Sequence, residues 1–109
     1  MKQPTFDKDG YPTEETLRII REWKIESKKN TVRLLTFCVN AWNWKPYGIT
    51  AKDSGYEFHV GGWSGNEDII SAMQDNRLFW SLCWQASRRG GHYKFDLTGV
   101  PECITNQLT

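Results

Sequence analysis

The chain has 109 residues, of which 39% are hydrophobic and 25% charged, and its formal net charge is +1. These values are those of one soluble globular domain. They exclude an acidic mimic of DNA and a protein whose overall field attracts nucleic acid, although a local basic patch remains open.

The N-terminal part predicts an irregular lead-in followed by a helix. Residues 1–12 are polar and contain turn-forming proline and glycine, so we expect no regular element there. Thr13 is a good N-cap residue, and Glu14 and Glu15 place negative charge in the first turn, where the helix dipole favours it. Apolar residues then recur at helical spacing, which predicts a first helix over residues 13–26.

A second helix is expected after a short polar break. Asn30 or Thr31 is the expected cap, and the apolar residues that follow are again spaced to line one face of a helix. The pair Lys45-Pro46 is expected to stop this helix, because the residue before a proline avoids the helical region.

The pattern then changes to strands. Residues 47–52 and 56–60 are predicted strands, and Asp53-Ser54-Gly55 between them is a hairpin signal. Ser64 and Glu67 match the capping box S-x-x-E, which predicts a helix directly after the second strand.

Residues 77–88 are the most ambiguous part of the chain. A helix here would extend the preceding one by several turns. We predict a strand instead, because apolar residues, many of them aromatic, alternate with a period of two. A turn over residues 88–91 then leads to a last predicted strand over 92–97.

The predicted order of elements is α-α-β-β-α-β-β. It indicates one α+β domain over residues 13–98, with a mostly antiparallel four-stranded sheet and helices packed on one face. Residues 99–109 are expected to form a C-terminal tail. In this topology the helix after the second strand runs back along it, so residues 88–92 are expected at the same end of the sheet as residues 61–66.

This end of the sheet is the predicted binding site. A helix N-terminus offers free N–H groups to an anion, arginine adds forked donors, and tryptophan supplies a flat face for stacking. The expected ligand-binding residues are Trp44, Trp63, Ser64, Asn66, Arg88, Arg89 and His92. The alternative is that the glycine pairs beside them serve only tight turns and that the arginines are a solvated turn.

No pattern indicates catalysis or metal binding. Neither His59 nor His92 has a serine, cysteine or carboxylate at an identifying spacing. The three cysteines, Cys38, Cys83 and Cys103, show no metal-ligand spacing and indicate reduced thiols. We therefore predict no catalytic residue, no metal and no cofactor.

Three segments resemble a family of small proteins encoded by bacteriophages and prophages. They are GGWSGNEDII at residues 61–70, FWSLCW at 79–84 and SRRGGHYKF at 87–95. The resemblance extends over roughly residues 11–97 and brings no established activity with it. It implies a phage accessory protein in the host bacterial cytoplasm, and small phage proteins often block host machinery, including CRISPR and nucleotide-signalling defences.

The leading functional hypothesis is a non-enzymatic counter-defence inhibitor. Its expected partner is a host defence protein or a nucleotide-like anion. The net charge does not favour nucleic acid as the partner, and no membrane association is expected. The oligomeric state is left open. One alternative is an enzyme acting on a nucleotide or nucleic-acid phosphate, with His92 as base and the arginines stabilising charge. Another is an interaction or assembly module without a small-molecule ligand.

Overall fold

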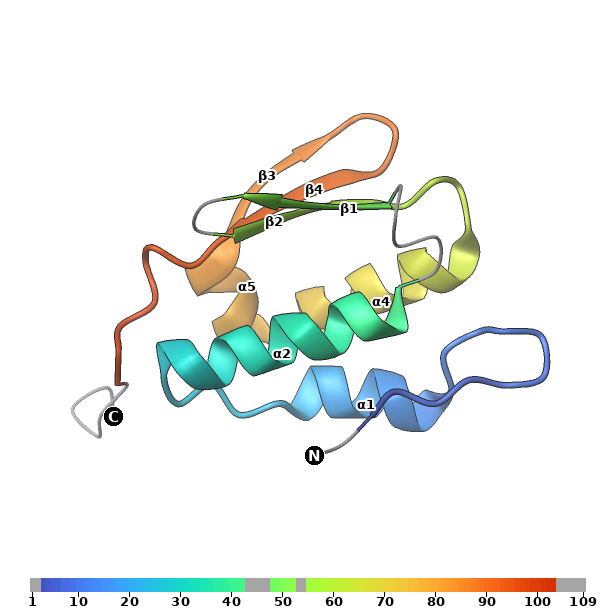
Figure 1. The fold of residues 1–109 in the computed structure, drawn as a ribbon, viewed down its shortest axis with the longest axis horizontal. Coiled ribbons are helices and arrows are strands. Elements are labelled where there is room, and N and C mark those ends of the chain that lie inside the picture. Colours follow the sequence, from blue (N-terminus) through green and yellow to red (C-terminus); the bar gives the residue numbers. More distant parts are fainter. Residues whose placement is uncertain (1–2, 43–47, 53–54, 104–109) are drawn as a thin grey trace.

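A computed structural model describes residues 3–42, 48–52 and 55–103, which form an α+β fold with an antiparallel sheet above a set of helices (Figure 1). In chain order the described elements are α1 (Glu14–Glu22), α2 (Lys28–Ala41), β1 (Ile49–Lys52), β2 (Gly55–His59), α4 (Ser64–Asp75), α5 (Arg77–Cys83), β3 (Trp84–Arg88) and β4 (His92–Asp96). The predicted fold class, the four-stranded antiparallel sheet and the order of elements are confirmed, with α5 as an addition. None of the helices in these ranges is both long and apolar enough to cross a membrane.

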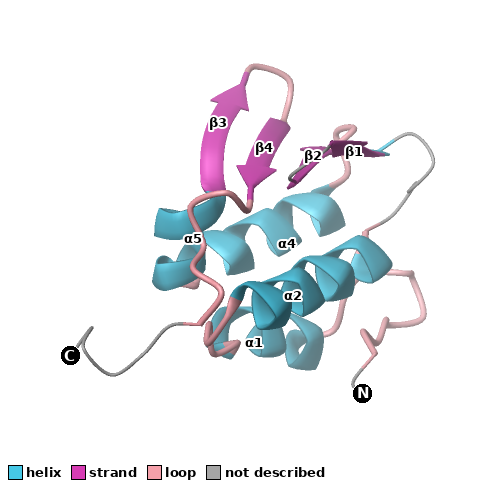
Figure 2. Ribbon diagram, turned by 60° about the vertical axis from the view of Figure 1, so that its left-hand side comes forward, coloured by secondary structure: helices cyan, strands magenta, loops and turns pink. Residues whose placement is uncertain are grey.

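The sheet has one face packed on helices and one face left open. Its strands lie in the order β1-β2-β4-β3, and each neighbouring pair is antiparallel. In both views the helices lie on one side, with α2 and α4 next to the sheet and α1 beyond them (Figures 1 and 2). Because strand residues alternate between faces, Phe58 is fully buried against the helices while Glu57 and His59 lie on the opposite, outer face.

Aromatic rings form the centre of the core. Phe58, Phe79 and Phe95 are almost completely buried, and the Phe95 ring centroid lies 5.6 Å from that of Phe58 and 5.5 Å from that of Phe79. The indole of Trp42 meets Phe58 edge-on at 4.9 Å. Aromatic residues make up 14% of the sequence, and these four rings fill the space between the sheet and the helices.

Helix α1 begins where the sequence predicts and ends earlier. The Thr13 hydroxyl accepts a hydrogen bond from the Thr16 N–H (3.2 Å), as expected of an N-cap. The predicted end at residue 26 is wrong, since the last helical residue is Glu22. Two carbonyl groups at this end, those of Ile20 and Trp23, accept hydrogen bonds from the buried side chain of Asn76.

Helix α2 is capped three residues earlier than predicted. The N-cap is Ser27, whose hydroxyl accepts from the Asn30 N–H (3.0 Å), so the expected caps Asn30 and Thr31 lie inside the helix. The side-chain oxygen of Asn30 reaches back past the N-cap and accepts from the Glu26 N–H (3.1 Å), one residue before the donor of a standard capping box. The helix ends at Ala41, and the predicted stop at 45–46 lies outside the described residues.

The capping box predicted for α4 does not form. Trp63 holds the N-cap position without a side-chain cap, and Ser64 is already the first helical residue. The Trp63 carbonyl accepts from the N–H groups of Asn66 and Glu67, which starts the helix without the serine hydroxyl.

The predicted strand over 77–88 is wrong in its first part, where α5 replaces it. Asn76 both ends α4 and caps α5, with its side-chain oxygen accepting from the Phe79 N–H (3.3 Å). The residues that α5 buries are Phe79 and Cys83, four apart as a helix requires, whereas Leu78 is 44% exposed. The strand begins only at Trp84.

Residues beyond the last strand pack on the body of the domain. Val100 is 2% exposed and belongs to the core, and Cys103 pairs with Ser27 through an isolated antiparallel bridge. Lys28 forms an ion pair with Glu102 in the same place. The described part of the predicted tail is thus held against the start of α2.

Thiol labelling tests the burial of the three cysteines. Burial and, secondarily, the charge of Asp96 raise the pKa of Cys83 to about 12, and burial also raises the pKa of Cys38 well above its ordinary value. Cys103 is exposed. At pH 8 we expect a disulfide reagent to modify Cys103 rapidly and the other two thiols only in denaturant, because the thiolate is the reactive form. Rapid labelling of Cys38 or Cys83 in the native protein would contradict this arrangement of the core.

Candidate binding site at the β3–β4 hairpin

The structure brings the two predicted segments to one end of the sheet. His59, the last residue of β2, pairs with His92, the first residue of β4, and the next residue, Val60, donates its N–H to the Gly91 carbonyl (2.9 Å). The loop that leads from β2 into α4 therefore begins beside the β3–β4 turn. This predicted convergence holds although residues 77–83 are helical, because the short strand Trp84–Arg88 still runs in the required direction.

Two arginines lie on a tight turn that projects away from the helices (Figure 2). The turn Arg89-Gly90-Gly91 has φ of +89° and +79° at its glycines, values that other residues rarely adopt. Arg88 and Arg89 are exposed, and neither guanidinium group has a hydrogen bond or ion pair within the described residues. Their guanidinium groups are thus free to take a carboxylate or phosphate from outside.

Two histidines meet on the outer face of the sheet, next to this turn. The Nδ1 atoms of His59 and His92 are 2.6 Å apart, a direct hydrogen bond between the rings. The Nε2 atom of His59 lies 3.3 Å from the Thr50 hydroxyl and 3.8 Å from a carboxylate oxygen of Glu57. Arg88 is opposite His92 in the register of β3 and β4, so a guanidinium is available on the same face.

The contact of His59 with His92 was not predicted from the sequence. The alternation of its strand placed it on the polar face, which is the one signal that it is accessible. Its partner is 33 positions away, and the pairing register that joins them depends on the β3–β4 turn.

Trp63 and Ser64 contact the N-terminal lead-in. The Trp63 ring packs on Tyr11, with centroids 4.9 Å apart, and lies so close to Gly65 that a Cβ there would be 2.2 Å from the ring. The Ser64 hydroxyl donates to the Tyr11 hydroxyl (3.2 Å). These side chains fasten residues near the start of the chain to α4, and the indole lies against the first turn of the helix, where an anion was expected.

Asn66 is placed inside the protein. It is 1% exposed, and its side-chain N–H group donates to the Val60 carbonyl (3.1 Å). The side chain therefore fixes the loop between β2 and α4 rather than facing solvent. Trp44 lies outside the described residues.

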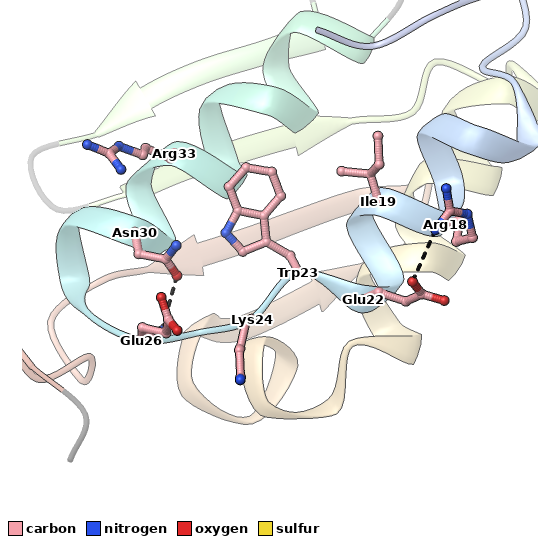
Figure 3. A pocket seen from close by; sticks show the side chains of 8 residues that line it. All are labelled: Arg18, Ile19, Glu22, Trp23, Lys24, Glu26, Asn30 and Arg33. Atoms are coloured by element: carbon pink, nitrogen blue, oxygen red, sulfur yellow. Dashed lines mark hydrogen bonds and ion pairs between the residues drawn. The ribbon is translucent and has the colours of Figure 1, made fainter. Parts of the chain in front are cut away.

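A second concave surface lies far from the arginine turn, between α1, α2 and the segment that joins them (Figure 3). It has a volume of about 630 Å³, and Trp23 stands at its centre. The Trp23 indole nitrogen is buried and has no hydrogen-bond partner within the described part of the chain. The charged residues that line the groove are Arg18, Glu22, Lys24, Glu26 and Arg33.

No protein-family model matches this chain, and no curated protein or solved structure is significantly similar to it. The geometry of the described residues is therefore the basis for a functional assignment. Of the predicted site residues, Arg88 and Arg89 are exposed and His92 contacts His59, which was not predicted. At the start of α4, the exposed Ser64 bonds to Tyr11 and the buried Asn66 fixes the loop before the helix.

Proposed function

We propose that this protein is a non-enzymatic binding protein that holds an anionic surface of a partner through Arg88 and Arg89. The observation that carries the proposal is the pair of exposed guanidinium groups on a projecting glycine turn, which have no acidic partner among the described residues. Arginine forms forked, charge-assisted hydrogen bonds to carboxylate and phosphate, and such residues are frequent anchors of interfaces.

The partner that fits this arrangement best is a protein with an acidic patch. The turn stands at one end of the sheet, and the described helices lie on the opposite side from the sheet's outer face (Figure 2). The net charge is only +1, so the attraction is local and is expected to weaken with salt. On the resemblance of the sequence to phage proteins, we infer that this partner is a host defence protein and that the protein acts as a counter-defence inhibitor. A nucleotide-like anion is the other ligand that two arginines would bind by the same chemistry.

A second candidate function is catalysis on a phosphate ester. The observation in its favour is the contact between His59 and His92 on the same face as Arg88, since histidine can transfer protons and arginine can stabilise developing charge. Turnover separates the two functions. An enzyme converts a nucleotide or oligonucleotide and loses that activity in His92→Ala, whereas a binding protein returns the ligand unchanged.

Replacing both arginines is expected to abolish binding without unfolding the protein. Arg88→Ala with Arg89→Ala removes the proposed anchors, and exposed substitutions usually change the free energy of unfolding by no more than about 0.5 kcal/mol. The measurement is an affinity capture from lysate of defence-carrying bacteria, with proteins and small molecules both identified. The captured partner is then titrated by calorimetry at two salt concentrations.

The chain offers a matched control in Lys24→Ala with Arg33→Ala. It removes the same number of exposed positive charges from the groove between α1 and α2, far from the hairpin. Loss of the partner in the hairpin variant alone supports the proposal. If the wild type and both variants capture the partner equally, the arginine turn is excluded as the binding site. If both variants lose the partner equally, the effect is due to net charge and not to the turn.

A further inference from the structure

His59 and His92 are cross-strand neighbours, an arrangement in which two imidazole rings can chelate one metal ion. Val60 and Gly91, one position beyond the ends of β2 and β4, continue the ladder, because the Val60 N–H donates to the Gly91 carbonyl. The adjacent pair, His59 and His92, is therefore a pair without backbone hydrogen bonds, in which the two side chains lie closest together. Their Nδ1 atoms face each other at 2.6 Å.

Little movement would admit a metal ion between the rings. Bonds from imidazole nitrogen to zinc are about 2.0–2.1 Å long, so two ligand nitrogens on one tetrahedral ion lie about 3.3 Å apart. From the present contact of 2.6 Å, the two Nδ1 atoms would have to separate by about 0.7 Å, with the rings turned so that both lone pairs point at the ion. Small rotations of the two side chains on the outer face supply this movement.

The second nitrogen of His59 already has the partners that a metal ligand needs. Its Nε2 lies near the Thr50 hydroxyl (3.3 Å) and the Glu57 carboxylate (3.8 Å). If Nε2 carries the proton and donates it to these oxygens, Nδ1 presents its lone pair toward His92. Such partners fix the tautomer and the orientation of ligand histidines in metalloproteins.

We propose that His59 and His92 bind a transition-metal dication through their Nδ1 atoms. Imidazole ligands favour Zn²⁺, Ni²⁺ and Cu²⁺ over Mg²⁺ and Ca²⁺, which prefer oxygen. The described residues contain no group of three or more histidine, cysteine or acidic side chains that could hold a metal ion, so the chelate has two protein ligands and solvent completes the coordination. This inference concerns the histidine pair and does not depend on the arginine-bound partner.

The charged residues near the histidine pair have opposite effects on the affinity for a metal dication. Arg88 pairs with His92 in the sheet, and Lys94 pairs with Glu57 on the same outer face. The two cations lower the affinity for a dication, and the carboxylate offsets part of this effect. Removing Arg88 or Lys94 is therefore expected to strengthen metal binding, a change that a structural role of the histidines would not produce.

The test is a calorimetric titration of the untagged protein with Zn²⁺ and with Ni²⁺ in a buffer without phosphate. All proteins carry Cys103→Ser, because the exposed thiol would compete for the metal. We expect one ion per chain, no binding of Mg²⁺, and an affinity reduced by at least about tenfold in His59→Ala and in His92→Ala, since each variant loses the intramolecular second ligand. Lys94→Ala is expected to bind more tightly than the parent protein.

Two controls keep the result interpretable. His59→Gln and His92→Gln retain a polar side chain of similar length and serve if an alanine variant fails to fold, which circular dichroism reports. Thr50→Val should weaken binding by up to about tenfold through loss of the orienting hydroxyl. The absence of saturable binding by the parent protein, or equal affinity in the parent and the single histidine variants, would overturn the proposal.

Discussion

Asn76→Ala is expected to lower the free energy of unfolding by roughly 3 kcal/mol, because one buried side chain joins three helices. The residue is 5% exposed, and its side-chain N–H groups donate to the carbonyls of Ile20 and Trp23, both at 2.9 Å. Its oxygen accepts from the Phe79 N–H and caps α5. Loss of a cap costs about 1 kcal/mol, and each buried group left without its partner adds about 1–3 kcal/mol.

Urea unfolding followed by circular dichroism measures this effect, with Asn30→Ala as the matched control. Asn30 also bonds a backbone N–H, that of Glu26, but at a partly exposed helix start, so its loss should cost about 1 kcal/mol or less. Asn76→Asp separates the two roles, since it keeps the acceptor for Phe79 and removes both donors to α1. An Asn76→Ala variant as stable as Asn30→Ala would mean that the link between α1 and α5 contributes little.

The same asparagine explains why the sequence misled for residues 77–83. The alternation of apolar residues there is real, and it fits a strand as well as a buried helix segment. The deciding contacts are the hydrogen bonds from Asn76 to residues 53 and 56 positions earlier, which fix a helix start that no local pattern contains. In the structure Asn76 is both the C-cap of α4 and the N-cap of α5.

Local sequence patterns predicted a cap or a turn correctly where contacts between residues close in the sequence determine it. Thr13 caps α1 as expected, and Arg89-Gly90-Gly91 forms the expected turn, because both depend on residues within a few positions. The caps of α2 and α4 were nevertheless misplaced. Ser27 and Trp63 occupy those positions, and the packing of Trp63 on Tyr11 involves a residue far away in the chain.

The candidate site was predictable in position and only partly in composition. The order of strands was enough to place Arg88 and Arg89 beside the loop after β2, since antiparallel topology fixes which ends meet. The burial of Asn66 was not predictable from its residue type, because this polar side chain is buried and donates a hydrogen bond to the Val60 carbonyl in the loop before α4. The contact of His59 with His92 depends on the pairing register of β2 and β4, which cannot be read from the sequence.

Phe95→Ala is expected to destabilise the protein by about 3–5 kcal/mol, the usual cost of removing a fully buried phenylalanine ring. Phe95 is 1% exposed and lies on β4, which pairs with strands on both of its sides. Its ring meets those of Phe58, Phe79 and Trp80 at centroid distances of 5.5–5.6 Å, so its loss opens a cavity between the sheet and α5. For a domain of this size such a loss is a large fraction of the total stability.

Trp84→Ala is the matched control for this prediction. Trp84 pairs with Phe95 across the two strands, but its side chain is at the surface: the residue is 42% exposed, stacks on Trp80 at 5.9 Å, and donates to the Ser87 hydroxyl. Its removal should cost about 1 kcal/mol, the scale of one aromatic pair. Equal losses in the two variants, measured by urea unfolding, would show that the sheet is held by its edge rather than by the ring cluster beneath it. A large difference would locate the stability in the contact between β4 and α5, and would leave the exposed Trp84 available for interactions outside the domain.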